Sequence, residues 1–390
     1  MNSITVLNVV SARYLPVRLD FRMAVVHNLA SRYFTVNVCV VLESGSGLFG
    51  YGECVPRSYV TGETPESVVS ALKVMLKDIT EKSLSSPQEL LSLLENTGTS
   101  ETGIKNPSAM CALELALLDM AGKHWNLSVS DILGFTGKAT SLFYSLVVPM
   151  IPDDAIQAFL EPAKGFGFSH VKIKVDSNNP ARRVRTVKEI MGSDIEIRVD
   201  ANCSWNSTDA PGFFRELAEL GVVSVEQPLP ADALDDMAKL RSLGLLLITL
   251  DESVQGSSDV KRAATAGACD IINVRISKCG GLLGALRVME TAIGSGLDIQ
   301  LGAHVGESCI LSAAGAYLAA STSSFRWLEG FFGEHLLKKD LCSADMRFGR
   351  GGQVIPHAGP GLGIQVECSR IEEAHKLYEK TVLNKTSSIR

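Results

Sequence analysis

Five polar residues recur at an almost constant spacing in the second half of the chain. Lys174, Asp200, Glu226, Asp251 and Lys278 lie 26, 26, 25 and 27 residues apart, in the segments KIKVD, RVDAN, VEQP, LDES and RISKCGG. Each of them follows a short apolar run, and the spacing is that of one strand, one helix and their two loops. Because corresponding ends of neighbouring barrel strands converge on one mouth, the spacing predicts a single site built from five distant segments.

The segment HVKIKVD, residues 170–176, places two lysines on one face of a strand, because successive side chains of a strand point to opposite faces. An edge strand with a solvated lysine face is the ordinary interpretation of such a pair, since lysine is seldom buried. The other strand-end residues favour a different interpretation. We predict that Lys174 is a catalytic base and that Lys172 is the like charge that lowers the pKa of Lys174.

Three of the five residues are carboxylates from successive strands. Carboxylates that face inward together repel one another and are costly to bury without compensation. A helix N-cap or a loop salt bridge explains any one of them, but three in register predict a divalent cation. Ligation by oxygen alone suits Mg²⁺, with Mn²⁺ as a substitute, and we expect Asp200, Glu226 and Asp251 to be the ligands.

Lys174 and Lys278 come from the second and sixth predicted strands, on opposite sides of the mouth. A substrate carboxylate bound to the ion would present its α-carbon between the two lysines. A proton could then leave or return on either face of that carbon. The ion would stabilise the enediolate that forms on proton loss.

These residues require a barrel to position them, and the chain from about residue 143 has the pattern of one. Short apolar runs alternate with amphipathic helices that end in or near glycine. Parallel strands with crossover helices predict an α/β fold, and eight strands close a TIM-type barrel. The predicted strands are LFYSLVV, VKIKV, IEIRV, VVSVEQ, LLLITL, IINVRI, DIQLGA and FRWLEG.

Three units follow from this pattern. Residues 1–135 combine strand-like runs such as FTVNVCVVLES with helical periodicity such as PESVVSALKVMLKDI, and are predicted to form an α+β domain. Residues 140–345 form the barrel. Residues 350–390, with the glycine-rich turn GPGLGIQVE, are expected to pack back on the first domain.

Composition narrows the function classes. The chain has 390 residues, of which 46% are hydrophobic and 21% charged, and a net charge of −6 with scattered basic residues argues against nucleic-acid binding. No apolar run has the length of a membrane span, and the first residues lack the pattern of a signal peptide. Nine cysteines without a CxxC pair indicate reduced thiols. We expect a cytoplasmic homo-oligomer that acts on a small-molecule carboxylate.

The ordered set KxK, DAN, EQP, DES and SKCGG resembles the enolase superfamily, in its muconate lactonizing enzyme subgroup. The resemblance extends to GYGECVPRSYVTGETPESV in the first domain and to PGLG near the C-terminus. It implies a modified (β/α)7β barrel with an N-terminal capping domain. It also implies the metal ligands and the two acid/base lysines named above, with Lys172 in a supporting role and Asn202 and Gln227 shaping the site.

The mandelate racemase subgroup is similar to the chain at GAH, where His304 ends the seventh strand, and at WLEG, which contains Glu329. The histidine base of that subgroup needs an acidic partner three residues before the strand-six lysine, and this chain has Arg275 there. We therefore expect Lys278 to be the second base and His304 to contact the substrate. Glu329 matches the carboxylic acid that hydrogen-bonds the substrate carboxylate in this family.

The substrate is less well defined by the sequence. Loops of the capping domain, around residues 14–28 and PRSYVTGET, are expected to select it. VTGET is similar to a stretch of the dipeptide epimerases, but LEGFFG replaces the Asp-x-Asp with which those enzymes hold the dipeptide amine. Phe331 and Phe332 suggest an apolar substrate end. An N-acylamino acid, a dipeptide, a hydrophobic carboxylic acid and a lactone precursor all remain open.

Three functions are compatible with these residues. The first is a Mg²⁺-dependent racemase or epimerase that transfers a proton between Lys174 and Lys278. The second is a cycloisomerase of the muconate type or a dehydrating synthase of the o-succinylbenzoate type, with one lysine as base and the other as a cation. The third is a binding or structural protein that kept the barrel and lost the chemistry, and the intact lysines and carboxylates argue against it.

Overall fold

The second half of the chain forms one parallel sheet of eight strands in sequence order. A backbone hydrogen bond of 2.8 Å from Ser145 N to Leu328 O joins its two edges and closes the barrel. The structure is a computed structural model that describes residues 6–27, 30–80, 82–97, 99–100, 103–137, 139–343 and 346–387. The barrel strands are β8 (Leu146–Val148), β9 (His170–Lys174), β10 (Glu196–Asp200), β11 (Val222–Glu226), β12 (Leu247–Leu250), β13 (Ile271–Val274), β14 (Asp298–Leu301) and β15 (Phe325–Leu328).

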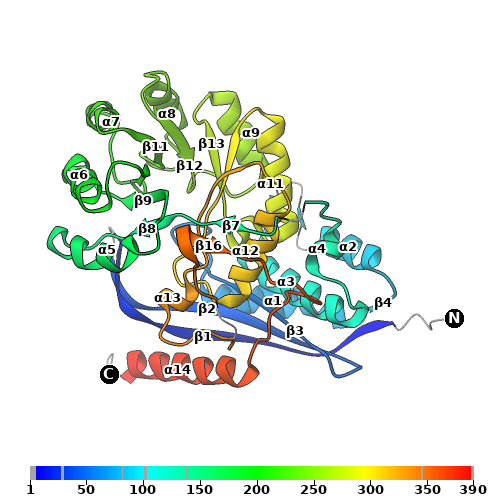
Figure 1. The fold of residues 1–390 in the computed structure, drawn as a ribbon. Helices are drawn as coiled ribbons and strands as arrows, with labels where there is room; N and C mark the ends of the chain where they lie inside the picture. Colours follow the sequence, from blue (N-terminus) through cyan, green and yellow to red (C-terminus); the bar gives the residue numbers. More distant parts are fainter. Residues whose placement is uncertain are drawn as a thin grey trace.

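A helix follows each of the first seven barrel strands, which confirms the predicted α/β fold (Figure 1). The strands read as apolar runs because the helices cover their outer faces, and all four residues of β13 are buried. The helices start and stop at the expected signals. Asn179 caps the first turn of α6 by accepting a hydrogen bond from Arg182 N, and Gly267 ends α9 in the left-handed conformation. The connecting helices are α5 (Ile156–Lys164), α6 (Pro180–Met191), α7 (Ala210–Glu219), α8 (Leu234–Arg241), α9 (Ser257–Ala266), α11 (Leu282–Gly294) and α12 (Cys309–Ala320).

The first domain is an antiparallel sheet covered by helices. Its strands are ordered β3-β2-β1-β4, and the long pair β1 (Leu7–His27) and β2 (Ala30–Ser44) dominates it. A Cβ at Gly50 or Gly52 of β3 (Phe49–Cys54) would collide with the backbone of α3, so glycine lets the helix lie directly on the sheet. The remaining elements of this domain are α1 (Pro65–Thr80), β4 (Ser83–Leu84), α2 (Pro87–Asn96), β5 (Thr99–Ser100), β6 (Gly103–Ile104), α3 (Pro107–Trp125) and α4 (Val129–Leu133).

The last helix, α14 (Cys368–Ser387), lies along β1, at the bottom of Figure 1. Arg13 pairs with Glu372 at 3.1 Å, and His375 Nδ1 lies 2.7 Å from Pro16 O. The short strand β16 (Gln353–Val354) pairs with β7 (Leu142–Phe143) beside the barrel. The C-terminal segment thus contacts both the barrel and the first domain.

Buried polar groups tie the first domain to the barrel. Glu53 of β3 accepts hydrogen bonds from Asn37 Nδ2 at 2.6 Å and from Ser308 Oγ at 2.6 Å, and Asn37 also donates to Gly306 O. Burial raises the pKa of Glu53 to about 7, although these donors oppose the shift. The seam holds the capping domain over the loop that follows β14. Among the described helices, none is both long and apolar enough to cross a membrane.

Candidate active site

Strand register aligns the first site residues. In the parallel pairing, Lys174 lies opposite Asp200, and Asp200 lies opposite Glu226. The three residues therefore form one row at the carboxyl ends of β9, β10 and β11. Lys172, two residues earlier on β9, points to the same side but lies deeper in the barrel. In the strand register it lies opposite Arg198 of β10. The spacing in the sequence thus becomes adjacency at the barrel mouth, as predicted.

One cavity of about 210 Å³ lies at this mouth. The barrel contributes the predicted ligands and lysines of β9 to β12, together with Asn202, His304, Glu329 and Phe331. The capping domain forms the opposite wall with Phe21, Met23, Val25, Arg32, Arg57 and Tyr59. Strands and cap together enclose the cavity, which places the predicted specificity segment around residues 14–28 at its edge. The part of that segment beyond His27 lies outside the described residues.

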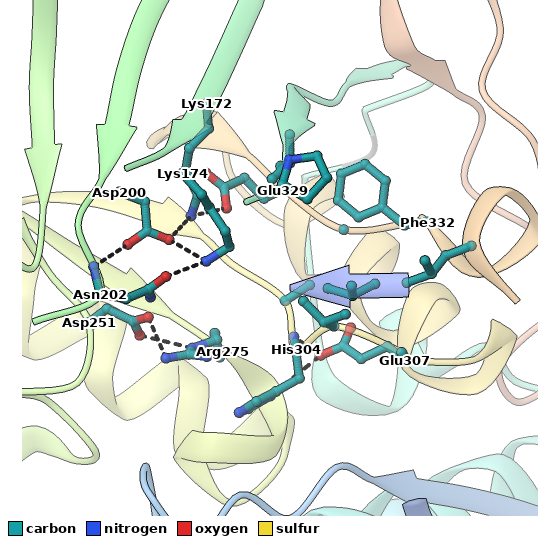
Figure 2. A pocket seen from close by; sticks show the side chains of 18 of the residues that line it. Lys172, Lys174, Asp200, Asn202, Asp251, Arg275, His304, Glu307, Glu329 and Phe332 are labelled. Atoms are coloured by element: carbon teal, nitrogen blue, oxygen red, sulfur yellow. Dashed lines mark hydrogen bonds and ion pairs between the residues drawn. The ribbon is translucent and has the colours of Figure 1, made fainter. Parts of the chain in front are cut away.

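The two lysines of β9 have different surroundings (Figure 2). The ammonium of Lys172 lies 2.6 Å from Glu329, 3.1 Å from Glu226 and 3.4 Å from Asp200. Burial would lower the pKa of Lys172, but these three carboxylates raise it, so this lysine keeps its charge. Lys174 Nζ is closer to the cavity and donates to Asp200 Oδ2 at 2.9 Å and to Asn202 Oδ1 at 2.6 Å.

The buried carboxylates divide into two kinds. Burial opposes ionisation of Asp200, yet Lys174 and Lys172 lower its pKa to about 2. For Glu226, burial is the larger effect, and with the neighbouring acids it raises the pKa to about 8 even though Lys172 is close. Asn273 Nδ2 and Gln300 Nε2 hold the two oxygens of Glu226 at 3.2 and 2.8 Å. The positive charge of Lys172 therefore does not fully compensate the burial of Glu226 beside the neighbouring acids.

The sixth strand ends differently from the sequence expectation. β13 stops at Val274, Arg275 is the N-cap of the short helix α10 (Ile276–Cys279), and Lys278 lies within that helix. The side chain of Lys278 is 0% exposed and Nζ donates to Asp251 O at 2.7 Å, Asp251 Oδ1 at 2.7 Å and Asn273 O at 3.1 Å. Lys278 does not line the cavity. Its acid/base role stays a prediction.

Arg275 occupies the cavity wall on this side. Its guanidinium is hydrogen-bonded through Nε and Nη2 to the two oxygens of Asp251, with Nε at 2.8 Å from Oδ1. Burial favours the neutral acid, but Arg275 and Lys278 together hold the pKa of Asp251 well below its ordinary range. Burial is likewise outweighed for Arg275, because Asp251 and Glu252 raise its pKa. This side of the cavity carries a fixed cation.

His304 is a buried imidazole without a hydrogen-bond partner on either ring nitrogen among the described residues. Its side chain is 2% exposed, and Nδ1 lies 3.7 Å from Glu307 Oε1, which instead accepts a hydrogen bond from the backbone N–H of His304 at 2.7 Å. Burial, then Arg275 and Arg57, hold the pKa of His304 well below its usual value. In Figure 2, His304 and Arg275 lie in the lower part of the view and Lys174 in the upper part. These effects hold the imidazole in its neutral form.

Glu329 follows β15 and is held by two cations, Lys172 at 2.6 Å and Arg198 at 2.9 Å. The prediction that it hydrogen-bonds a substrate carboxylate is not tested by these contacts. Arg198 was not singled out in the sequence, although RVD shows it two residues before Asp200 on the same face. It also donates to Ser145 Oγ at 2.7 Å and so fixes Glu329 to the barrel interior.

Three residues around the cavity have left-handed backbone conformations, with φ of 42° at Asn202, 39° at Gln227 and 63° at Phe331. Such angles are unfavourable for side chains larger than asparagine and are retained where the surroundings impose them. Gln227 Oε1 accepts hydrogen bonds from Asp251 N at 2.9 Å and Ser253 N at 3.2 Å. Gln227 therefore positions the backbone of a predicted ligand, whereas Phe331 packs into the wall against Tyr144, with ring centroids 5.8 Å apart.

The donor set suits a hard divalent cation in type and location. Asp200, Glu226 and Asp251 line one cavity and offer carboxylate oxygens. The raised pKa of Glu226 is a second indication, because an added cation would favour its ionised form. In the present arrangement of the described residues no three acidic, histidine or cysteine side chains converge as a finished metal site. Lys172, Lys174 and Arg275 hold the carboxylates instead.

Two family models together match most of the chain. The mandelate racemase/muconate lactonizing enzyme N-terminal domain matches residues 5–134, and the enolase C-terminal domain-like family matches residues 155–370. The chain is 30% identical over 364 residues to an N-succinyl-L-Arg/Lys racemase of Bacillus cereus, a match that covers 92% of this chain and 95% of the relative. It is 28% identical over 336 residues to a hydrophobic dipeptide epimerase of Enterococcus faecalis, covering 86% and 88%.

Solved structures agree with these matches. The crystal structure of the Bacillus cereus racemase superimposes with a TM-score of 0.84 at 27% identity, covering 95% of this chain and 98% of that one. A muconate lactonizing enzyme of Pseudomonas fluorescens gives a TM-score of 0.85 at 22% identity over 94% and 99%, which shows the shared fold. Racemases and epimerases are prominent among the relatives by sequence, which also include a muconate cycloisomerase of Acinetobacter baylyi and an o-succinylbenzoate synthase of Geobacillus kaustophilus, so an isomerase is supported. The resemblance inferred from the motifs is confirmed: the chain belongs to the mandelate racemase/muconate lactonizing enzyme family of the enolase superfamily.

Proposed function

We propose that this chain is a Mg²⁺-dependent racemase or epimerase that removes the proton α to a substrate carboxylate, with an N-acylamino acid or a dipeptide-like carboxylate as substrate. The observation that carries the proposal is one cavity that brings Lys174 together with three carboxylates from neighbouring strand ends. The activities of the relatives point to the same class of reaction.

Asp200, Glu226 and Asp251 are the residues that would hold the ion. When bound, Mg²⁺ supplies the positive charge that stabilises the enediolate oxygens. Lys172 remains charged between Glu226 and Glu329 and keeps these acids in place. Lys174 takes the proton from one face of the α-carbon, and Asn202, which accepts its hydrogen bond at 2.6 Å, orients the amine.

The opposite face requires a second group, and Lys278 is sealed away from the cavity. Arg275 cannot serve as a base, because Asp251 raises its pKa further above an already high value. His304 lines the cavity as a neutral imidazole with two free ring nitrogens among the described residues. We assign the second proton transfer to His304.

A one-sided reaction, as in a cycloisomerase or a dehydrating synthase, is the second candidate. The contact that favours it is the Arg275–Asp251 pair, which fixes a cation where a second base was expected. In such a reaction Lys174 would still remove the proton, and Arg275 would stabilise charge on the other side.

Deuterium exchange tests the proposal. Racemic N-acylamino acids, dipeptides and hydroxy acids are incubated in D₂O with enzyme and Mg²⁺, and a mass gain of one is measured for each hand. Exchange that depends on Mg²⁺ and occurs in both hands is the expected result. Exchange in one hand with a new product would favour the one-sided reaction, and no exchange with any compound would contradict the proposal.

Metal binding has a separate test that does not require a substrate. Removal of Glu226 as a ligand, by Glu226→Gln, should weaken Mg²⁺ binding measured by calorimetry at least tenfold, because loss of a group that only hydrogen-bonds a metal ligand already costs about 10- to 100-fold. The variant leaves Lys172 paired with Asp200 and Glu329, so the fold should persist. Unchanged Mg²⁺ affinity would show that the ion binds elsewhere. We also retain the expectation of a homo-oligomer, which sedimentation would test.

A further inference from the structure

A chain of two hydrogen bonds connects Lys174, through Asn202, to Glu252. Asn202 Oδ1 accepts the hydrogen bond from Lys174 Nζ at 2.6 Å, and Asn202 Nδ2 donates to Glu252 Oε1 at 3.2 Å. Lys174 is the last residue of β9, whereas Asn202 and Glu252 lie just beyond the ends of β10 and β12. All three side chains line the cavity. Glu252 is therefore joined to the proposed base by a single amide group.

The carboxyl group of Glu252 has one hydrogen-bond partner in the described part of the chain. Oε1 accepts the hydrogen bond from Asn202, and Oε2 is buried without a partner there. A buried carboxyl oxygen without a partner costs free energy. The side chain thus does not build a network of its own within the loop that follows β12. Its one contact is the amide of Asn202.

The amide of Asn202 fits its place either way round, because its oxygen and nitrogen ends have nearly the same shape. The backbone of Asn202 is fixed by a φ of 42° and by its N–H, which donates to Asp200 Oδ1 at 3.0 Å, but these do not decide which end of the amide faces Lys174. Glu252 does decide it. A carboxyl group keeps an acceptor oxygen whether it is ionised or protonated, and Nδ2 can only donate, so the nitrogen end turns toward Glu252.

The orientation of this amide matters for a base. A neutral amine has hydrogens to donate and one lone pair with which to take a proton. In Figure 2, Lys174 donates to Asp200 Oδ2 at 2.9 Å and to Asn202 Oδ1, and this arrangement leaves the lone pair free for a substrate proton. If the amide were turned, Nδ2 would donate to the lone pair and block it. The ammonium form of Lys174 resists that turn, because it only donates, but the neutral base does not.

We propose that Glu252 is a positioning residue, which holds the amide of Asn202 with its oxygen toward Lys174 and so keeps the lone pair of the base available. This inference rests on the proposed function, because it takes Lys174 as the group that removes the α-proton. Glu252 acts only through Asn202.

Two substitutions at Glu252 have nearly the same shape and differ in hydrogen bonding. Glu252→Met removes the acceptor, whereas Glu252→Gln keeps a carbonyl oxygen within reach of Asn202 Nδ2. In Glu252→Met, kcat of α-proton exchange should fall by about tenfold or more, because a small misplacement of a catalytic group costs up to about 10²-fold. KM should stay close to the wild-type value, since the contact acts on the base and not on substrate binding. Glu252→Gln should keep most of kcat.

Exchange in D₂O, followed for each enantiomer separately, shows whether the effect passes through Lys174. The loss in Glu252→Met should be confined to the hand that Lys174→Ala slows, because the other face of the α-carbon does not use this base. Glu216→Met, at an exposed position of α7, is the matched control and should exchange both hands as the wild type does.

A second measurement needs no substrate. In protein with isotope-labelled asparagine, the NMR signal of the Asn202 side-chain amide is assigned by its absence in Asn202→Ala. This signal should shift in Glu252→Met, where Nδ2 loses its acceptor, and return toward the wild-type position in Glu252→Gln. Glu216→Met should leave it unchanged.

The outcomes separate this inference from the proposed function. Equal slowing of both hands, in the Met and Gln variants alike, would make Glu252 a structural residue and overturn the inference. An Asn202 amide signal that is the same in the wild type and in Glu252→Met would also overturn it, even when the wild type exchanges both hands. A wild type that exchanges only one hand would contradict the racemase proposal, and the inference would stand if Glu252→Met slows that hand and shifts the amide signal.

Discussion

The second and sixth strands of the barrel each lead to a lysine, and the two lysines differ in their access to the cavity. Lys174 is the last residue of β9, its side chain is 12% exposed, and it lines the cavity. Lys278 lies four residues beyond the end of β13, in α10, and its side chain is 0% exposed. The alternation of a strand fixes the direction of a side chain only as far as the strand continues. The spacing of 27 residues therefore brings Lys278 next to Asp251, and its acid/base role stays a prediction.

The first prediction tests Lys174 as the general base. Lys174→Ala should reduce α-proton exchange by about 10³-fold or more, the contribution of a positioned general base. The thermal midpoint should change little, because Asp200 keeps Lys172 as a partner at 3.4 Å. Exchange rates measured by NMR in D₂O and a calorimetric scan give the two values. Exchange within tenfold of the wild type would place the base elsewhere.

The second prediction concerns the sealed lysine. Lys278→Met should lower the free energy of unfolding by about 3 kcal/mol, because it removes one partner of the buried Asp251 carboxylate. Exchange per folded molecule should fall far less than in Lys174→Ala. Urea denaturation measures the first value, with Lys261→Met at an exposed position as the control. A stable variant without exchange would instead support an acid/base role for Lys278.

The third prediction asks which group serves the face opposite Lys174. His304→Asn should slow exchange of one enantiomer by about 10²-fold and spare the other, since removing a base blocks only its own face. Chiral chromatography combined with mass analysis follows both hands. Equal slowing of the two hands would show that His304 only shapes the cavity.

The smallest expected effect concerns Glu53, which links the capping domain to the loop that follows β14. Glu53 has a pKa of about 7 in the fold against an ordinary value of 4.5, so the folded state binds a proton that the unfolded state has lost between these pH values. Its contribution to stability is therefore greatest below about pH 4.5 and is lost as the pH rises through about 7.

In the Glu53→Gln variant this loss of stability with rising pH should be absent, because glutamine does not ionise. The free energy of unfolding of the wild type, relative to the variant, should decrease by about 1 kcal/mol or more between pH 5 and pH 7.5 in urea denaturation. A constant difference across this range would mean that Glu53 is ionised throughout.

The fold and most of the site could be predicted because they depend on patterns that persist along the chain. Apolar runs at a regular interval specified the barrel, and register then brought Lys174, Asp200 and Glu226 into one row. Residues that act through a single long-range contact gave no such signal. Arg57 and Arg198 are unremarkable in the sequence, and only the closed barrel with its cap shows that Arg198 pairs with Glu329, whereas Arg57 donates to the backbone oxygen of Val305.

The contact between α14 and β1 has a consequence for the order in which the molecule assembles. β1 precedes the barrel in the chain, yet the helix that lies along it is formed by residues 368–387, which follow the barrel. Contacts so far apart in sequence carry a large loop-closure cost and slow folding. During translation β1 must remain without this cover while the whole barrel emerges, so the sheet that contains β1 is open to wrong strand pairing during this interval.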